Sequence, residues 1–537
     1  MASPSCTAPS RPAWIAAFSC GLLAVALRLV VMWAPPLDIY WKGEPWTEEW
    51  MRGNIAHELV HGPLLPLQDH QIPFWGGMNW VGVMAAPSFA LLGETLFALR
   101  LAVLPFAFAL AFAGFLLLER RAGRRAAWLG GLVLACMPPG WLYASATAQG
   151  THCELAALVF VLLWLWNEDR LHDHAHKGWS FASGLAYGGH ISFGIGPALV
   201  LVPLLDWARD RRFCLRAAFL PRLAGIAVGA IPFLFYQLRY GGALRIYDGD
   251  TVGGLALPDD GLSPWTKLFD LVSRDWADSL WLQSTPQGGV HLGATLVGLA
   301  MALAWAWAAW RWRRELQAWI GAVLPWRPVR VELDAFVVVL AWPIAYLPLY
   351  LLAPFGLGLR EWLIDYRYLL APQPFVLLAG IAALAAWSET GAQARRFMVA
   401  SLVALACLGF TWSALARLEW SRGAELRQAS GSRPAGVAKC LLWKHGTDPE
   451  RLADFVARVE ARRSGAERDE LHHELARLLR LMASAQDRQG RVPRGPRDDP
   501  RRALEDAARL VAEPRRSYYA IGSGPVQPLP PRRTNAR

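Results

Sequence analysis

Residues 101–143 read LAVLPFAFALAFAGFLLLERRAGRRAAWLGGLVLACMPPGWLY, two apolar runs on either side of an arginine-rich stretch. The runs, near 101–118 and 127–143, are long enough to cross the roughly 30 Å hydrocarbon core of a bilayer as helices. Because positive residues concentrate in cytoplasmic loops, we expect the ERRAGRR segment, 119–125, to turn inside the cell. The stretch therefore predicts a pair of membrane-crossing helices joined on the cytoplasmic side.

Similar apolar runs recur along the whole chain. Of its 537 residues, 54% are hydrophobic and only 18% are charged, which exceeds what one soluble core needs. The other apolar spans lie near residues 12–34, 154–166, 180–205, 220–238, 290–311, 333–354, 369–388 and 398–414. The glycine-rich run 180–205 should make two short helices, so that about eleven helices cross the membrane. We expect an all-α polytopic membrane protein.

The distribution of arginine predicts the orientation. Under the positive-inside rule the N-terminus is cytoplasmic, as are four arginine-rich segments, residues 119–125, 208–216, 311–315 and 393–396. External loop 1, about 35–100, and a second external loop, about 239–289, then lie outside. The run 78–95 must be a helix lying in or dipping into the outer surface, because a full crossing would reverse every later loop. The first span lacks a small-residue cleavage site and should stay as an anchor.

The basic charge and the cysteines exclude other classes of function. The formal net charge is +11, but the basic residues lie mainly in short loops and the C-terminal tail, so topology explains most of it and no nucleic-acid partner is expected. The seven cysteines are scattered, without a CxxC pair or metal-ligand spacing. They indicate neither a disulfide framework nor a zinc site.

The composition changes after Ala414, where a charged, helix-compatible segment begins. From about Asp487 the chain is rich in Pro, Arg and Gly. We expect a transmembrane domain over 1–414, a small helical domain on the outside over 415–484 and a disordered basic tail over 485–537.

The segment GEPWTEEWMRGNIAHELVHG, residues 43–62, places the adjacent carboxylates Glu48 and Glu49 in external loop 1. A charge at the edge of a bilayer must face water or a polar cavity, which favours a functional role. Successive helical residues point about 100° apart, so only one of the two can readily enter a given pocket. The alternative is a helix start capped by Thr47, where acidic side chains favour the dipole. As a helix, the segment also has an apolar stripe suited to the membrane surface, formed by Met51, Ile55 and Leu59.

A second acidic site lies at the outer start of the span 154–166. His152 and Glu154 are two residues apart and would face opposite ways on a regular helix. Either could reach a cavity shared with Glu49. Thr151 and Glu154 also match a T-x-x-E capping box, which is the alternative role for this carboxylate.

A third candidate site is the segment REWLIDYRYLLAPQP, residues 360–374, which places Tyr366, Arg367 and Tyr368 directly before an apolar span. The planar fork of an arginine makes paired hydrogen bonds to phosphate. An interfacial Tyr/Arg anchor is an equally favoured reading.

Several motifs, taken in order, resemble the membrane glycosyltransferases of the GT-C class. They are the acidic pair after the first span, the A-x-x-L-x-x-G-like run 56–62, FWGG at 74–77, LLGETLFALRL at 91–101, AIPFLFYQLRYGG at 230–242 and RYLLAPQP at 367–374. The chain is most similar to the glycosyltransferase 39-like group, which includes the protein O-mannosyltransferases and the aminoarabinose transferase of lipid A. The likeness covers roughly residues 12–390 and lies more in the order and spacing of the elements than in any one motif.

The resemblance implies a GT-C-like bundle with external surface helices, in the inner membrane of a bacterium, with the C-terminal domain periplasmic. Such an enzyme takes a hexosyl or pentosyl group from a polyprenyl-phosphate carrier and gives it to an envelope acceptor. It implies no certain cofactor and leaves a divalent cation open. Membrane lipids are the other expected partners.

In the family an acidic residue of the first external loop is the base, which corresponds to Glu49 or Glu48, and a second acidic residue corresponds to Glu154. Two departures concern the donor: the usual Asp of the first motif is Glu here, and Ile72 stands before Pro73 where relatives can have a basic residue. A carboxylate base would take the acceptor's proton as direct displacement inverts the anomeric centre. The residues expected to bind the substrate, its leaving phosphate included, are Arg52, His152, Arg239, Arg245, Tyr366, Arg367 and Tyr368.

A transporter or lipid flippase is the rival interpretation. Such proteins place polar residues near the bilayer midplane on broken helices, often in repeated halves. Here the acidic candidates lie at outer helix ends, and no internal repeat is visible. His190 is the main feature favouring transport, and we expect it to be packed or locally hydrogen-bonded among glycines that allow close helix contact. A noncatalytic membrane scaffold would leave the outside carboxylates unexplained.

Overall fold

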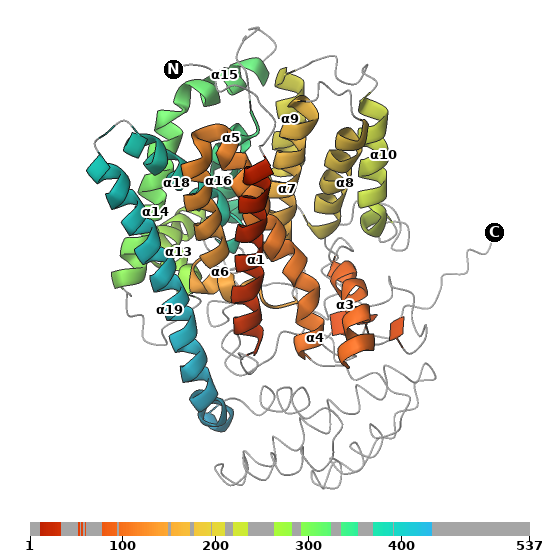
Figure 1. The fold of residues 1–537 in the computed structure, drawn as a ribbon, viewed down its shortest axis with the longest axis vertical. Helices are drawn as coiled ribbons and strands as arrows, with labels where there is room; N and C mark the ends of the chain where they lie inside the picture. Colours follow the sequence, from red (N-terminus) through yellow and green to blue (C-terminus); the bar gives the residue numbers. More distant parts are fainter. Residues whose placement is uncertain are drawn as a thin grey trace, which may run out of the picture.

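The computed structural model describes residues 11–33, 52–53, 55–56, 59–60, 78–93, 96–148, 152–171, 177–194, 196–209, 218–234, 263–281, 292–323, 334–352, 369–389, 391 and 393–431. Regular structure within these ranges is helical (Figure 1). The elements are α1 (Arg11–Trp33), α3 (Met78–Leu92), α4 (Leu96–Arg100), α5 (Leu104–Cys136), α6 (Pro139–Ala144), α7 (His152–Leu171), α8 (Lys177–Phe193), α9 (Ala198–Arg209), α10 (Phe219–Gly229), α12 (Pro264–Asp270), α13 (Trp276–Trp281), α14 (Leu292–Arg311), α15 (Arg313–Val323), α16 (Phe336–Leu352), α18 (Gln373–Glu389) and α19 (Gln393–Gly431).

Helix α5 folds back on itself at Gly123. The φ of this residue is 79°, in the left-handed region that glycine adopts without steric cost. A Cβ on Gly114 would collide with Leu134, and a Cβ on Gly130 would collide with Leu118. These pairs are symmetric about the turn, so residues 104–122 and 124–136 are antiparallel and closely packed. This confirms the expected hairpin with its turn in the arginine-rich segment.

Three of the predicted cytoplasmic segments meet at the end of the bundle that holds this turn. Arg121 forms an ion pair with Glu315 at 2.5 Å, and Arg125 donates to the carbonyl oxygen of Arg396 at 2.5 Å. Arg124 donates to the carbonyl oxygen of Pro12, near the start of α1, at 3.3 Å. We call this end the arginine-rich end. The segment 208–216 lies almost wholly outside the described residues.

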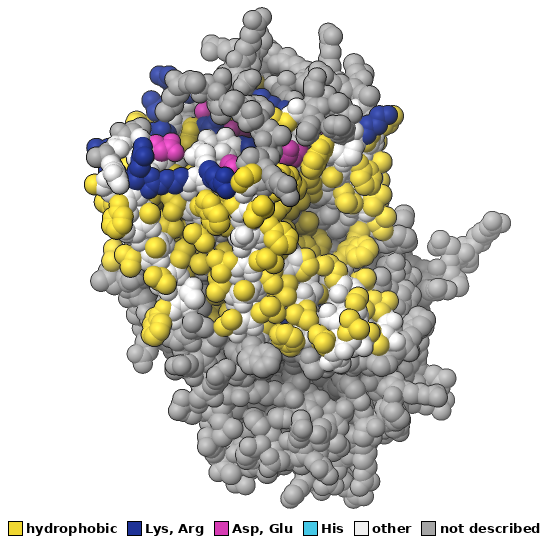
Figure 2. Space-filling model, viewed as in Figure 1, with side chains coloured by type: hydrophobic (Ala, Val, Ile, Leu, Met, Phe, Trp, Pro, Cys, Tyr) yellow, Lys and Arg dark blue, Asp and Glu magenta, His cyan; other side chains and the backbone are white. Residues whose placement is uncertain are grey.

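The surface separates charged from apolar side chains. Figure 2 shows Lys, Arg, Asp and Glu gathered in a band at the arginine-rich end and a broad hydrophobic belt next to it. Within the described residues, three stretches are long and apolar enough to cross a membrane, by length and composition: Pro12–Met32, Phe97–Cys136 and Gln393–Trp412. Because α5 folds back at Gly123, the second of these contains two antiparallel helices. The total of about eleven crossings stays a prediction.

The run 180–205 divides into two helices, as expected, since α8 ends at Phe193 and α9 begins at Ala198. The glycines of α8 bring it against α10 without intervening side chains. A Cβ on Gly184 or Gly188 would collide with the carbonyl oxygens of Arg222 and Ile226. Small residues allow such close approach of helices in a membrane, where van der Waals packing drives association.

Two segments differ from the sequence expectation. Helix α19 is continuous from Gln393 to Gly431, so the apolar span predicted to finish at 414 leads directly into charged sequence. The stripe residue Ile55 is buried, because it packs against Gly82 of α3, whereas Leu59 is half exposed. Ile55 thus contacts another helix rather than lipid. The remaining stripe residue, Met51, lies outside the described residues.

Candidate functional site

A pocket lies at the end of the bundle away from the arginine-rich end. Its walls come from the first turns of α5, from α6 and the turn after it, and from the start of α7, all remote from Gly123. The wall residues are Val103, Phe106, Ala107, Leu110, Trp141, Ser145, Cys153 and Glu154.

Glu154 supplies the carboxylate of this pocket. It lies in the first turn of α7 and is only 2% exposed. His152, two residues earlier, is half-buried and is absent from the wall. The carboxylate of Glu154 belongs to a pocket wall whose other residues are mostly apolar. Thr151, the residue that would complete a capping box, lies outside the described residues.

Arg28 is a buried cation near the pocket that the sequence reasoning missed. It is 0% exposed, and its Nε donates to Ser145 Oγ at 3.0 Å. Its Nη1 donates to the carbonyl oxygens of Ala24, at 3.3 Å, and Ala135. Arg28 is the lone charged residue in the sequence from Pro12 to Trp33. An ionisable residue within a membrane span indicates a functional site by default, so this signal was present.

The connection from α5 to α6 carries strain. Met137 has a φ of 25° and a ψ of 154°, which a side-chain-bearing residue rarely adopts. Arg28 holds both sides of this connection, because its partner Ala135 precedes Met137 and its partner Ser145 follows α6. Trp141, in α6, is fully buried between them. Arg28 therefore links the end of α5 to Ser145, a residue of the pocket wall.

The other predicted site residues are not brought into this pocket by the described structure. Arg52 is fully buried, and its carbonyl oxygen lies against Gly82 of α3. It is absent from the pocket wall. The remaining predicted residues lie outside the described part of the chain: Glu48, Glu49, Arg239, Arg245, Tyr366, Arg367 and Tyr368.

His190 is packed rather than hydrogen-bonded. It is fully buried, 6.4 Å from Trp342 between ring centroids, and neither ring nitrogen has a partner within the described structure. A Cβ on Gly196 would lie 3.1 Å from both His190 and Trp342. Of the two expected surroundings, the packed one is confirmed.

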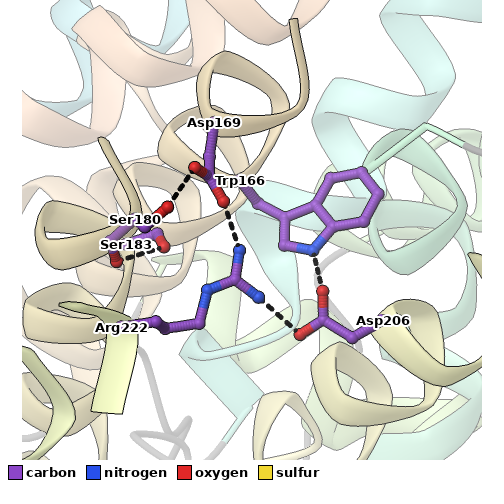
Figure 3. A network of polar contacts seen from close by, with 6 residues as sticks. All are labelled: Trp166, Asp169, Ser180, Ser183, Asp206 and Arg222. Atoms are coloured by element: carbon purple, nitrogen blue, oxygen red, sulfur yellow. Dashed lines mark hydrogen bonds and ion pairs between the residues drawn. The ribbon is translucent and has the colours of Figure 1, made fainter. Parts of the chain in front are cut away.

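A separate polar network at the arginine-rich end was also missed (Figure 3). The guanidinium of Arg222 joins Asp169 at 2.7 Å to Asp206 at 2.8 Å. Ser180 Oγ donates to Asp169 at 2.5 Å, and Trp166 Nε1 donates to Asp206 at 2.7 Å. The cation has its counter-charges and the carboxylates have donors. This network, the Arg222 network, has the properties of a brace among α7, α8, α9 and α10.

No group of three or more His, Cys, Asp or Glu side chains that could hold a metal ion occurs among the residues the structure describes. The described part of the chain therefore offers no candidate site for the divalent cation that the resemblance left open.

Comparison with known proteins gives structural neighbours only. No protein-family model and no curated protein sequence matches the chain. One similar structure is ArnT from Cupriavidus metallidurans bound to undecaprenyl phosphate, 16% identical, with 93% of this chain and 85% of that chain covered and a TM-score of 0.45. Another is the Archaeoglobus fulgidus oligosaccharyltransferase in complex with Zn and sulfate, 14% identical, with a TM-score of 0.46. That match covers 81% of this chain and only 57% of the oligosaccharyltransferase.

Proposed function

We propose that the chain is a membrane glycosyltransferase that moves a sugar from a polyprenyl-phosphate carrier to an envelope acceptor at the end that holds the pocket. The observation that carries the proposal is the buried carboxylate of Glu154 in a pocket whose other walls are largely apolar. A lipid-linked donor suits this setting, because its tail stays in the bilayer while its headgroup reaches a polar cavity at the membrane edge.

Glu154 has the chemistry that the reaction needs. An acceptor hydroxyl or amine must lose a proton as it attacks the anomeric carbon, and a carboxylate within hydrogen-bond reach can take it, typically a gain of roughly 10²- to 10⁴-fold. The leaving group is a phosphate, which needs stabilisation of charge more than protonation. Direct displacement of this kind inverts the anomeric centre.

The residues outside the described structure complete the proposal. Glu49, or Glu48, is proposed as the base of external loop 1, and Glu154 as a second carboxylate of the same cavity. Arg367, between Tyr366 and Tyr368, is proposed to contact the carrier phosphate through its planar fork. The acceptor, whether lipid, glycan or protein, lies on the periplasmic face of a bacterial inner membrane in this proposal.

The test is transfer of label. Purified full-length protein in lipid is incubated with a panel of labelled polyprenyl-phosphate sugars and envelope extract, and label in new products is measured. We expect label to move from at least one donor, and Glu154→Gln to reduce the rate by roughly 10²-fold or more.

Glu315→Gln is the matched control, because it removes a carboxylate at the arginine-rich end, far from the pocket. It should keep transfer. No transfer from any donor would refute the glycosyltransferase proposal, and wild-type transfer by Glu154→Gln would remove Glu154 from the mechanism.

A further inference from the structure

Two buried hydrogen-bond donors at the pocket have no acceptor. They are Nη2 of Arg28 and Nε1 of Trp141, and neither has a partner within the described structure. Both side chains are fully buried. Buried polar groups are almost always hydrogen-bonded. Arg28 donates to Ser145, which follows α6, the helix that carries Trp141, so these two donors without acceptors need an explanation. Each can donate and neither can accept, so the missing partner must supply acceptor oxygens.

The charge of Arg28 points to an anion. Its hydrogen-bond partners are carbonyl oxygens and one hydroxyl, all formally neutral, and no carboxylate pairs with it in the described part of the chain. Ala135 lies at the end of α5, where the helix dipole contributes only about half a negative charge. A buried guanidinium usually has a full counter-charge. The partner absent here is therefore an acceptor with negative charge.

The position of the two donors connects them to the pocket. Trp141 and Ser145 are wall residues, and Arg28 donates to Ser145. Ser145 Oγ is itself occupied, because it accepts from Arg28 and lies 3.2 Å from the carbonyl oxygen of Leu142, to which it donates. A bracing role explains Nε and Nη1 of Arg28, but it leaves Nη2 and the indole N–H of Trp141 without a function.

We propose that Arg28 and Trp141 bind a phosphate-type oxyanion at the inner wall of this pocket, the guanidinium supplying the charge and the indole a directed hydrogen bond. The oxyanion is a phosphate monoester or diester, carried by a lipid or free in solution. Its identification with the phosphate of the lipid-linked donor rests on the proposed function. The binding site itself rests on the two donors and the pocket.

The experiment measures binding directly. Radiolabelled polyprenyl phosphate is titrated against the purified full-length protein in lipid nanodiscs, and unphosphorylated polyprenol serves as the probe for the lipid tail alone. Trp141→Phe keeps an aromatic ring and removes only the N–H donor, and it should raise the Kd for polyprenyl phosphate roughly 10-fold or more. Arg28→Lys keeps the charge and loses the fork, and it should raise the Kd similarly. Polyprenol binding should not change in either variant.

Trp319→Phe is the matched control, because Trp319 of α15 also has a buried, unpartnered Nε1 but lies at the arginine-rich end. It should bind polyprenyl phosphate as the wild type does. Wild-type binding by Trp141→Phe overturns the shared site, and a loss confined to Arg28→Lys reduces Arg28 to a brace. Should Arg28→Lys fail to fold, Trp141→Phe decides alone.

Two further arms separate the sources and the two proposals. Displacement of the lipid by millimolar inorganic phosphate supports a site that recognises the oxyanion itself, and no displacement, with the variants still defective, supports a lipid-borne phosphate. Binding that depends on Trp141 in a protein that transfers no sugar sustains this site and refutes the transferase. If the wild-type protein transfers sugar and its Trp141→Phe and Arg28→Lys variants bind polyprenyl phosphate normally, the transferase proposal is sustained and this binding site is refuted.

Discussion

Arg222 and Arg28 are both buried arginines of the same helical bundle, yet their surroundings are opposite. Arg222, at the arginine-rich end, lies between the carboxylates of Asp169 and Asp206. Arg28, at the pocket end, has carbonyl and hydroxyl oxygens and one nitrogen left over. A paired charge contributes to holding helices together, whereas a charge without a counter-ion is ready for a ligand. This difference distinguishes the Arg222 network, which braces the helices, from the candidate ligand site at Arg28.

The contrast also bears on transport. A transporter must open toward both sides of the membrane, which would require the Arg222 network and the pairs of Arg121 with Glu315 and Asp334 to separate. The pairs of Arg121 lie where the turn of α5 meets the starts of α15 and α16, and the Arg222 network joins α7, α9 and α10. The side chains of Arg222 and Asp169 are both buried, so separating this pair is costly. This arrangement suits a bundle that stays closed at one end and works at the other.

The largest expected effect is all-or-none and concerns the side on which each end lies. A periplasm-dependent reporter fused after Arg422 should be active, and the same reporter fused after Arg125 should be inactive, because arginine-rich loops stay in the cytoplasm. Comparable activity at both positions would place Arg125 and Arg422 on the same side of the membrane. The predicted difference between the two ends of the bundle would then be lost. The first suspect would then be the run 78–95.

The sequence predicted the helices that carry these two arginines, but the roles of the arginines themselves were missed. The turn at Gly123 follows from arginines between two apolar runs. The break between α8 and α9 follows from a glycine-rich run whose two flanks should lie on the same side of the membrane. Asp169 and Asp206 could not be matched to Arg222 from sequence, because the pairing depends on how close four helices approach. Arg28 could have been found, since a lone arginine in an apolar span is itself a signal. Glu154 was found because it starts such a span.

The next largest effect should come from removing the cation of the brace. Arg222→Met leaves Asp169 and Asp206 without their counter-charge, and Asp169 has a fully buried side chain. We expect the free energy of unfolding to fall by about 3–5 kcal/mol, measured by titration with a denaturing detergent. The double variant Arg222→Met with Asp169→Asn should recover part of this loss. A loss below about 1 kcal/mol would mean that the network is not a brace.

A smaller effect is expected from the helix contact that places Arg222. A Cβ on Gly184 would meet the backbone of Arg222, so Gly184→Ala must push α8 away from α10. We expect a loss of about 1–3 kcal/mol in the same unfolding assay, as for other over-packed contacts. Gly178→Ala is the matched control on the same helix, because its Cβ would meet nothing within 4 Å. Equal stability of the two variants would show that the close approach is dispensable.

The smallest loss of stability should come from Arg28→Met, although this arginine is as deeply buried as Arg222. Removing it leaves no carboxylate unpaired in the described structure, only the oxygens of Ser145, Ala135 and Ala24. Ser145 can still donate to Leu142 and Ala24 lies within α1, whereas Ala135, in the last turn of α5, loses its donor. We expect a loss of about 1–2 kcal/mol, the cost of leaving buried acceptors without a donor.

The same variant, Arg28→Met, should lose polyprenyl phosphate binding. Arg222→Lys, which partly keeps the brace, should retain this binding. A stability loss as large as that of Arg222→Met, with lipid binding intact, would make Arg28 a second brace and remove the distinction between the two ends.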